Sequence, residues 1–160
     1  MTNHKTPLPA ALATAAATTT APLLVGVGAS AGGLEAFQEF LTGLDDTLGV
    51  SIVYVQHQDP QVHSQLPEVL ARSTSLEVVT LTERTKIKAN ALYICPPHAL
   101  LEIRHGSLLI EDQPEGILPT SPIDHFFRSL AENQGESGIG IILSGAGSDG
   151  TLGLKSISDY

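Results

Sequence analysis

From residue 23 onward, short apolar runs alternate with segments of helical periodicity. The apolar runs lie at residues 23–28, 49–55, 76–81, 91–94 and 138–143. The first intervening segment places Leu34, Phe37, Leu41 and Leu44 three or four residues apart, which predicts one buried helical stripe. Alternation of continuous apolar runs with helices is typical of a parallel sheet covered on both faces. The pattern predicts an α/β fold, a three-layer, doubly wound and mostly parallel sheet.

Further helices and a hairpin complete the expected order. A helix with Leu66, Val69 and Leu70 inward follows the second strand, and another begins at residue 152. Partial alternation on both sides of His105-Gly106 predicts a β-hairpin over residues 100–111. Ser121-Pro122-Ile123-Asp124 favours a helix start, with Ser121 as the N-cap, proline at the first position and an acid at the third.

Residues 1–22 differ from the rest, because they are rich in Ala, Thr and Pro and have no periodic apolar face. We expect a disordered leader here and one domain over residues 23–160. Lys5 before an Ala-rich stretch would also suit a secretory signal, but threonines interrupt its apolar part.

Composition narrows the classes of function. A net charge of −9 disfavours nucleic-acid and anionic-membrane binding. No apolar run approaches the roughly 18 residues of a membrane-spanning helix, so we expect no membrane insertion. The lone Cys95 cannot form an internal disulfide, which fits a reducing cytoplasm, and its apolar neighbours favour a packed side chain over a reactive thiol.

The stretch at residues 23–33, LLVGVGASAGG, predicts a buried strand, a tight turn of small residues and a helix, with the Ser30 hydroxyl at the apex. Small neighbours allow other groups to approach this hydroxyl, and the first N–H groups of a helix lack intrahelical partners. A serine in this position suits anion binding or attack on a carbonyl carbon.

Three predicted strands end in polar residues that match acyl-transfer chemistry: Ser30, His57 and Asp149. Functional groups gather at the carboxyl ends of the strands in a doubly wound sheet. A serine needs an imidazole to take its proton, and the imidazole needs a carboxylate to orient it. Glycine-rich loops can supply N–H groups to an oxyanion, and residues 28–32 satisfy the G-x-S-x-G pattern in a strand–turn–helix setting.

Structural explanations of the same residues remain open from the sequence. Ser30 and Asp149 could be helix N-caps, and His57 could be a strand-end histidine with a structural partner. Gly26, Gly28 and Gly32 come close to a dinucleotide-binding fingerprint, although no acid ends the second strand. A nucleotide- or phosphate-binding domain is therefore the second hypothesis, and a catalytically inactive signalling module is the third. No spacing of His, Cys and acidic residues indicates a metal site, and we expect no cofactor.

The chain resembles the catalytic domain of the chemotaxis protein-glutamate methylesterase CheB. The resemblance rests on residues 27–33 (VGASAGG), 55–57 (VQH) and 143–150 (LSGAGSDG), with ICPP at 94–97 and PIDHFF at 122–127 in the expected order. It implies a parallel α/β sheet and hydrolysis of glutamate γ-methyl esters on chemoreceptors, often with deamidation of glutamines.

By the same resemblance, Ser30 would be the nucleophile, His57 the general base and then acid, and Asp149 the carboxylate that orients it. The backbone N–H of Ala146 would donate to the oxyanion. The chain departs from the family at Ala31, where threonine is usual, and at Ala146, where methionine is usual.

The resemblance also implies partners and context. The substrate would be a methyl-accepting chemoreceptor, in the cytoplasm, with a receptor methyltransferase and a sensor kinase as fused or separate partners. Because the family's domain continues well past the acid's loop, we expect residues 23–160 to be incomplete at the C-terminus and to open a methylesterase/methyltransferase fusion.

Overall fold

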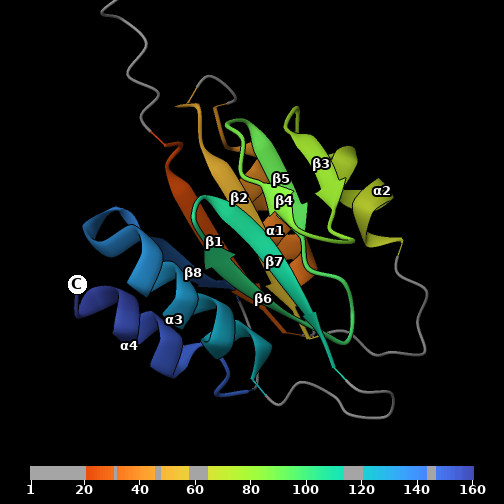
Figure 1. Ribbon diagram of the computed structural model, residues 1–160. Coiled ribbons are helices and arrows are strands. Elements are labelled where there is room, and N and C mark those ends of the chain that lie inside the picture. The colour runs from red at the N-terminus through yellow and green to blue at the C-terminus, as the bar shows by residue number, and fades with distance from the viewer. Residues whose placement is uncertain (1–20, 31, 46–47, 58–64, 114–120, 144–146) are drawn as a thin grey trace, which may run out of the picture.

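A five-stranded parallel sheet forms the centre of the protein (Figure 1). The computed structural model describes residues 21–30, 32–45, 48–57, 65–113, 121–143 and 147–160. The strand order is β3-β5-β2-β1-β8, and every neighbouring pair is parallel. The strands are β1 (Leu24–Ala29), β2 (Ser51–Gln56), β3 (Glu77–Thr80), β5 (Ala91–Ile94) and β8 (Ile139–Leu143).

Helices cover both faces of this sheet, which confirms the predicted α/β class. On one face, α1 (Gly33–Thr42) and α2 (Leu66–Ala71) bury Phe37, Leu41 and Leu70 against the sheet. Phe37 stacks on Tyr54 of β2 with ring centroids 4.1 Å apart. On the other face, α3 (Pro122–Gln134) and α4 (Thr151–Ser158) lie side by side (Figure 1).

A small antiparallel sheet packs on the same face as α3. It contains the predicted hairpin, β6 (Ala99–Arg104) and β7 (Ser107–Asp112), together with the two-residue strand β4 (Thr85–Lys86). The hairpin turn is built by His105 and Gly106, both at positive φ, as a two-residue turn between twisted strands requires. Strand β4 was not predicted, because two residues carry no periodic signal. The short 3₁₀ turn η3 (Gly135–Ser137) after α3 was not predicted either.

The last strand, β8, differs from the prediction of a buried strand. Ile139 is 39% exposed and Ile142 is 38% exposed. Among the described residues, β8 pairs only with β1 and stands at the edge of the strand order. An edge strand has one side without a neighbour, so its apolar run is covered less completely than that of a central strand.

Glycines in β1 allow α3 to lie directly on the sheet. A Cβ atom added at Gly26 would lie 2.9 Å from side-chain atoms of both Phe126 and Leu130. A Cβ atom at Gly28 would overlap the Ile123 side chain at the start of α3. The close approach of helix to strand therefore requires residues without side chains at these two positions.

The described helices include none with the length and apolar character needed to cross a bilayer. Residues 1–20 lie outside the described part of the chain, so the disordered leader stays a prediction. So do the exact bounds of the domain.

Replacing Gly28 with alanine tests how tightly α3 packs on β1. We expect Gly28→Ala to lower the free energy of unfolding by about 1–3 kcal/mol, because the new methyl group must displace Ile123. Urea denaturation measures the change. Gly43→Ala is the matched control, since its added Cβ would have only ordinary contacts at 3.7 Å. Equal stability of the two variants would contradict the packing described here.

Candidate functional site

The carboxyl ends of β1 and β2 bring Ser30 and His57 to the same edge of the sheet. The two strands are parallel and in register, with Ala29 opposite Gln56. The backbone N–H of His57 donates to the Ala29 carbonyl at 3.3 Å, which extends the ladder to the last residue before Ser30. Ser30 is half-buried directly after β1. Strand β1 runs downward in Figure 1 from the N-terminal trace, so this edge lies at the bottom of the view.

Asp149 reaches this edge from the loop between β8 and α4, and its carboxylate is hydrogen-bonded to the His57 side chain. The distance from His57 Nε2 to Asp149 Oδ2 is 2.7 Å, and the exposed fractions of the two side chains are 42% and 10%. A carboxylate that binds one ring nitrogen fixes the imidazole's orientation and tautomer. Because Asp149 binds Nε2, Nδ1 is the nitrogen that could exchange a proton with a serine hydroxyl.

The N-terminus of α3 holds the Asp149 carboxylate. Oδ1 accepts a hydrogen bond from the Asp124 N–H at 2.8 Å, and Oδ2 accepts one from the Ile123 N–H at 3.0 Å. The helix dipole adds a partial positive charge at this end. Of the three site residues expected from the sequence, His57 and Asp149 are thus joined by a hydrogen bond, and Ser30 lies at the same edge of the sheet.

This geometry changes the interpretation of three candidate helix caps. Ser121 occupies the N-cap position of α3, but within the described chain its side chain makes no capping hydrogen bond. Asp149 satisfies the first N–H groups of α3 instead, and α4, the helix it precedes, has Gly150 as its N-cap. Helix α1 likewise has Gly32, not Ser30, at its N-cap. Asp149 does act as a capping residue, but for α3, whose two N–H groups lie 25 and 26 residues earlier in the chain.

Gly150 shapes the turn that presents Asp149. Its φ of +95° belongs to the left-handed region, which L side chains rarely adopt. A Cβ atom there would also lie 2.8 Å from Ile123 and 2.9 Å from Ile142. The chain can therefore turn from Asp149 into α4 beneath α3 only with glycine at this position.

The glycines that resemble a dinucleotide fingerprint have packing roles here. Gly26 and Gly28 face α3, and their missing side chains are replaced by Ile123, Phe126 and Leu130. The helix that follows β1 lies on the other face of the sheet. These contacts explain the first two glycines without a bound phosphate and weaken the nucleotide-binding hypothesis.

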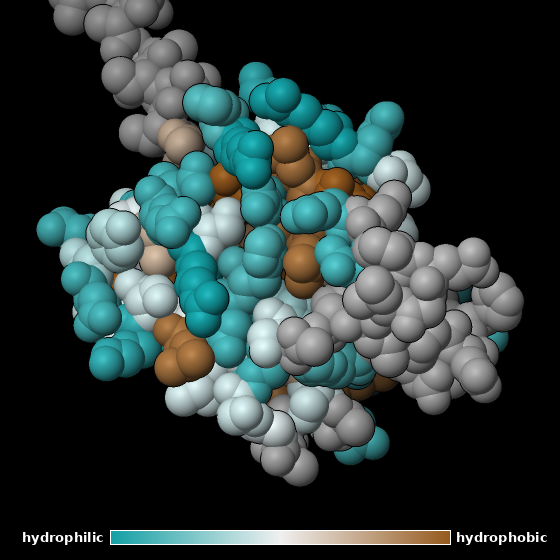
Figure 2. Space-filling view, turned by 60° about the horizontal axis from the view of Figure 1, so that its bottom comes forward, coloured by the Kyte–Doolittle hydropathy of each residue, from teal (hydrophilic) through white to brown (hydrophobic). Residues whose placement is uncertain are grey.

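Two parts of the expected site lie outside the described residues. They are Ala146, expected to supply the oxyanion N–H, and Ala31, which follows Ser30. The role of Ala146 stays a prediction. The surface at the lower end of Figure 1 comes forward in Figure 2, and the part of it that is not drawn in grey is mostly hydrophilic with hydrophobic groups between the polar ones.

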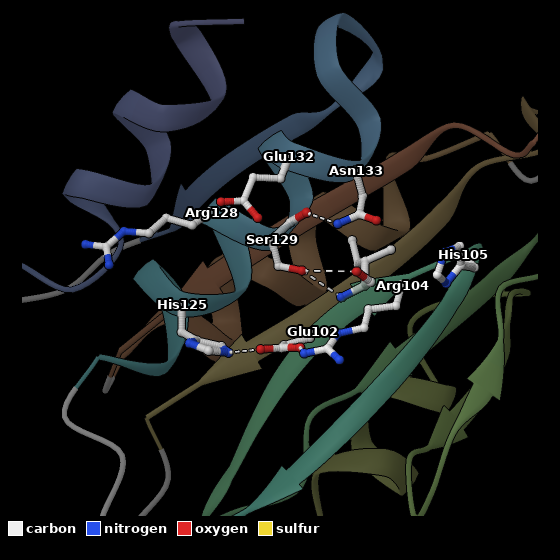
Figure 3. Close-up of a pocket in the computed structure, with 9 residues that line it drawn as sticks. Glu102, Arg104, His105, His125, Arg128, Ser129, Glu132 and Asn133 are labelled. Atoms are coloured by element: carbon white, nitrogen blue, oxygen red, sulfur yellow. Dashed lines mark hydrogen bonds and ion pairs between the residues drawn. The ribbon is translucent and has the colours of Figure 1, made fainter.

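A second cluster of polar groups lies between α3 and β6, in a cavity of about 380 Å³ (Figure 3). Two residues that line the cavity, Glu102 and His125, have ligand atoms within 4.8 Å of each other and of Glu111 on β7. The sequence spacing did not indicate this grouping, because each residue comes from a different element. Glu102 is already paired with Arg104, and His125 Nε2 is 3.5 Å from Glu102. Among the described contacts, Glu102 therefore links Arg104 of its own strand with His125 of α3.

Cys95 is buried directly after β5, as expected for a packed side chain. Burial raises the pKa of its thiol to about 12, so the nucleophilic thiolate is rare at neutral pH.

Comparison with known proteins places this geometry in a family. Residues 25–160 match the family model described as CheB methylesterase. The chain belongs to the CheB methylesterase family. The fold agrees with this assignment. The crystal structure of the Thermotoga maritima CheB methylesterase catalytic domain superimposes with a TM-score of 0.74 at 25% identity, covering 87% of this chain and 76% of that one.

Curated relatives in the CheB methylesterase family carry double names. The chain is 34% identical over 152 residues to protein-glutamate methylesterase/protein-glutamine glutaminase 2 of Cupriavidus metallidurans, covering 94% of this chain and 45% of the relative. It is 33% identical over 133 residues to protein-glutamate methylesterase/protein-glutamine glutaminase 1 of Pseudomonas fluorescens, covering 82% and 40%. The chain thus spans less than half the length of these two relatives.

Asp149 both caps α3 and contacts His57, so we expect its replacement to destabilise the protein more than replacement of His57 does. We expect Asp149→Ala to lower the free energy of unfolding by about 1–3 kcal/mol, because two N–H groups of α3 lose their acceptor. His57→Ala leaves those bonds intact and should cost much less, since its side chain is 42% exposed. Urea denaturation compares the two variants. Equal losses would show that Asp149 does not cap α3.

The raised pKa of Cys95 predicts slow alkylation. At pH 8 the native protein should react with iodoacetamide at least 100-fold more slowly than the urea-unfolded protein, because burial both hides the thiol and suppresses its thiolate. Mass spectrometry over time gives both rates. Rapid labelling of the native protein would contradict the burial of Cys95.

Proposed function

We propose that this chain is a serine hydrolase domain that removes methyl groups from glutamate γ-methyl esters of chemoreceptors. In this proposal Ser30 is the nucleophile, His57 is the general base and Asp149 orients His57. The observation that carries the proposal is the 2.7 Å contact between His57 and Asp149 at the sheet edge where β1 delivers Ser30. Membership of the CheB methylesterase family supports the choice of substrate.

In the first half of the reaction, the Ser30 hydroxyl adds to the ester carbonyl while His57 Nδ1 takes its proton. The tetrahedral intermediate carries the negative charge on the former carbonyl oxygen, and backbone N–H groups would stabilise it. The C–O bond to the methoxy group then breaks, and the imidazolium returns the proton, so methanol leaves. Asp149 stabilises the imidazolium between these two transfers.

In the second half, water attacks the glutamyl ester on Ser30. His57 takes a proton from the water and then donates it to the Ser30 oxygen as the acyl bond breaks, which releases glutamate and restores the enzyme. A glutamine side chain can follow the same route with ammonia as the leaving group. We therefore include deamidation in the proposal, in keeping with the second name of the relatives.

The proposal extends to partners and location. The substrate is a methyl-accepting chemoreceptor in the cytoplasm, with a receptor methyltransferase and a sensor kinase acting in the same system. The net charge of −9 fits a protein partner better than a nucleic acid. The Ala146 N–H is the proposed oxyanion donor.

Replacing the proposed nucleophile tests this function. We expect Ser30→Ala to reduce methanol release from a methylated chemoreceptor by roughly 10³-fold or more, because the acyl-enzyme can no longer form. Gas chromatography quantifies the methanol. Ser156→Ala is the control, since its exposed hydroxyl bonds the Leu152 carbonyl within α4.

Methanol release that persists in Ser30→Ala would exclude Ser30 as the nucleophile. A folded wild-type protein without esterase activity would favour the inactive signalling module. Saturable binding of a dinucleotide by that inactive protein would favour the second hypothesis.

A further inference from the structure

The N-termini of α3 and α4 are capped by each other's aspartates. Asp149, just before α4, accepts hydrogen bonds from the Ile123 and Asp124 N–H groups of α3. Asp124, in the first turn of α3, accepts a hydrogen bond on Oδ1 from the Gly153 N–H of α4 at 2.6 Å. Asp124 therefore uses its backbone to hold Asp149 and its side chain to hold the helix that begins two residues after Asp149.

The packing around this reciprocal pair leaves little room for rearrangement. Asp124 is 5% exposed. A Cβ atom added at Gly153 would lie 2.5 Å from Phe127 Cβ and 2.9 Å from the Asp124 carbonyl oxygen, so α4 touches the first turns of α3. A buried carboxylate is costly unless hydrogen bonds satisfy it, and the Gly153 N–H supplies one of them.

We propose that Asp124 is a positioning residue for catalysis, because it holds Asp149 in the place from which Asp149 orients His57. The inference rests on the function proposed above. The Asp124 N–H holds the Asp149 carboxylate. The Asp124 carboxylate holds the Gly153 N–H and so fixes the start of α4, the helix that follows Asp149. Held in this way, Asp149 Oδ2 lies 2.7 Å from His57 Nε2.

Loss of the Asp124 carboxylate removes the acceptor of the Gly153 N–H and frees the start of α4. Asp149 belongs to the turn that leads into α4 and moves with it, so His57 loses its orientation. Small displacements of a catalytic group reduce the rate strongly, by about 100-fold for an error near 1 Å. Asp124 acts on the reacting atoms only through Asp149, so its loss should lower kcat and leave KM nearly unchanged.

The test compares variants of Asp124 with a matched change on the same helix. Ser129 is a buried α3 residue whose hydroxyl accepts a hydrogen bond from the Ile103 N–H at 2.7 Å, and this bond ties α3 to β6 away from Asp149 (Figure 3). Ser129→Ala therefore removes a buried hydrogen bond of α3 without touching the reciprocal caps. Hydrolysis of a methylated receptor and urea denaturation are measured for every variant.

We expect Asp124→Ala to lower kcat about 100-fold at an unchanged KM. Asp124→Asn should recover most of the rate, because its amide oxygen can still accept from the Gly153 N–H. Ser129→Ala should keep kcat within about threefold of the wild type, whatever its stability. If Asp124→Ala does not fold, Asp124→Ser takes its place with the same expectation. The serine oxygen lies one bond nearer the backbone than the carboxylate oxygen and so falls short of the Gly153 N–H.

Three results would overturn the inference: Asp124→Ala with a kcat like that of Ser129→Ala, Asp124→Asn no faster than Asp124→Ala, or a loss confined to KM. In each of these cases the wild type still shows Ser30-dependent hydrolysis, so only the role of Asp124 is refuted and the proposed function stands. A folded wild type with no Ser30-dependent hydrolysis overturns the proposed function, and this inference with it.

Discussion

The position of the Asp149 carboxylate is the constraint on which the site depends. It accepts hydrogen bonds from two N–H groups at the start of α3 and contacts His57 at 2.7 Å. The helix end favours a negative charge, and that charge is what the imidazolium needs during acyl transfer. One interaction therefore contributes to helix capping and, in the proposed function, to catalysis.

Glycines make this arrangement sterically possible. Without a side chain, Gly28 lets Ile123 lie against β1, and Gly150 lets the chain turn from Asp149 into α4 next to Ile123. Gly153 lets α4 touch α3. A side chain at any of these positions would move α3 or α4 and, with them, the N–H groups that hold Asp149. The glycines carry no chemistry themselves, but they make room for the residues that position the candidate site.

The sequence predicted the features that depend on neighbouring residues. Apolar runs and helical spacing indicated the central strands and helices, and the polar residues that end β1 and β2 indicated Ser30 and His57. Contacts between distant segments could not be predicted. The local sequence allows Asp149 as a cap for the helix after it, whereas the structure shows that it caps α3. The expected Ser121 cap is absent from the described contacts of α3. The exposure of β8 depends on its edge position, which the local pattern does not contain.

Covalent labelling tests most directly whether Ser30, His57 and Asp149 act as one unit. The protein is incubated with a serine-reactive organophosphonate, and the modified residue and its rate of modification are determined by peptide mass spectrometry. The account predicts an adduct on Ser30 that forms at least 100-fold more slowly in both His57→Ala and Asp149→Ala. An adduct on another serine, or a Ser30 adduct whose rate is unchanged in both variants, would contradict it.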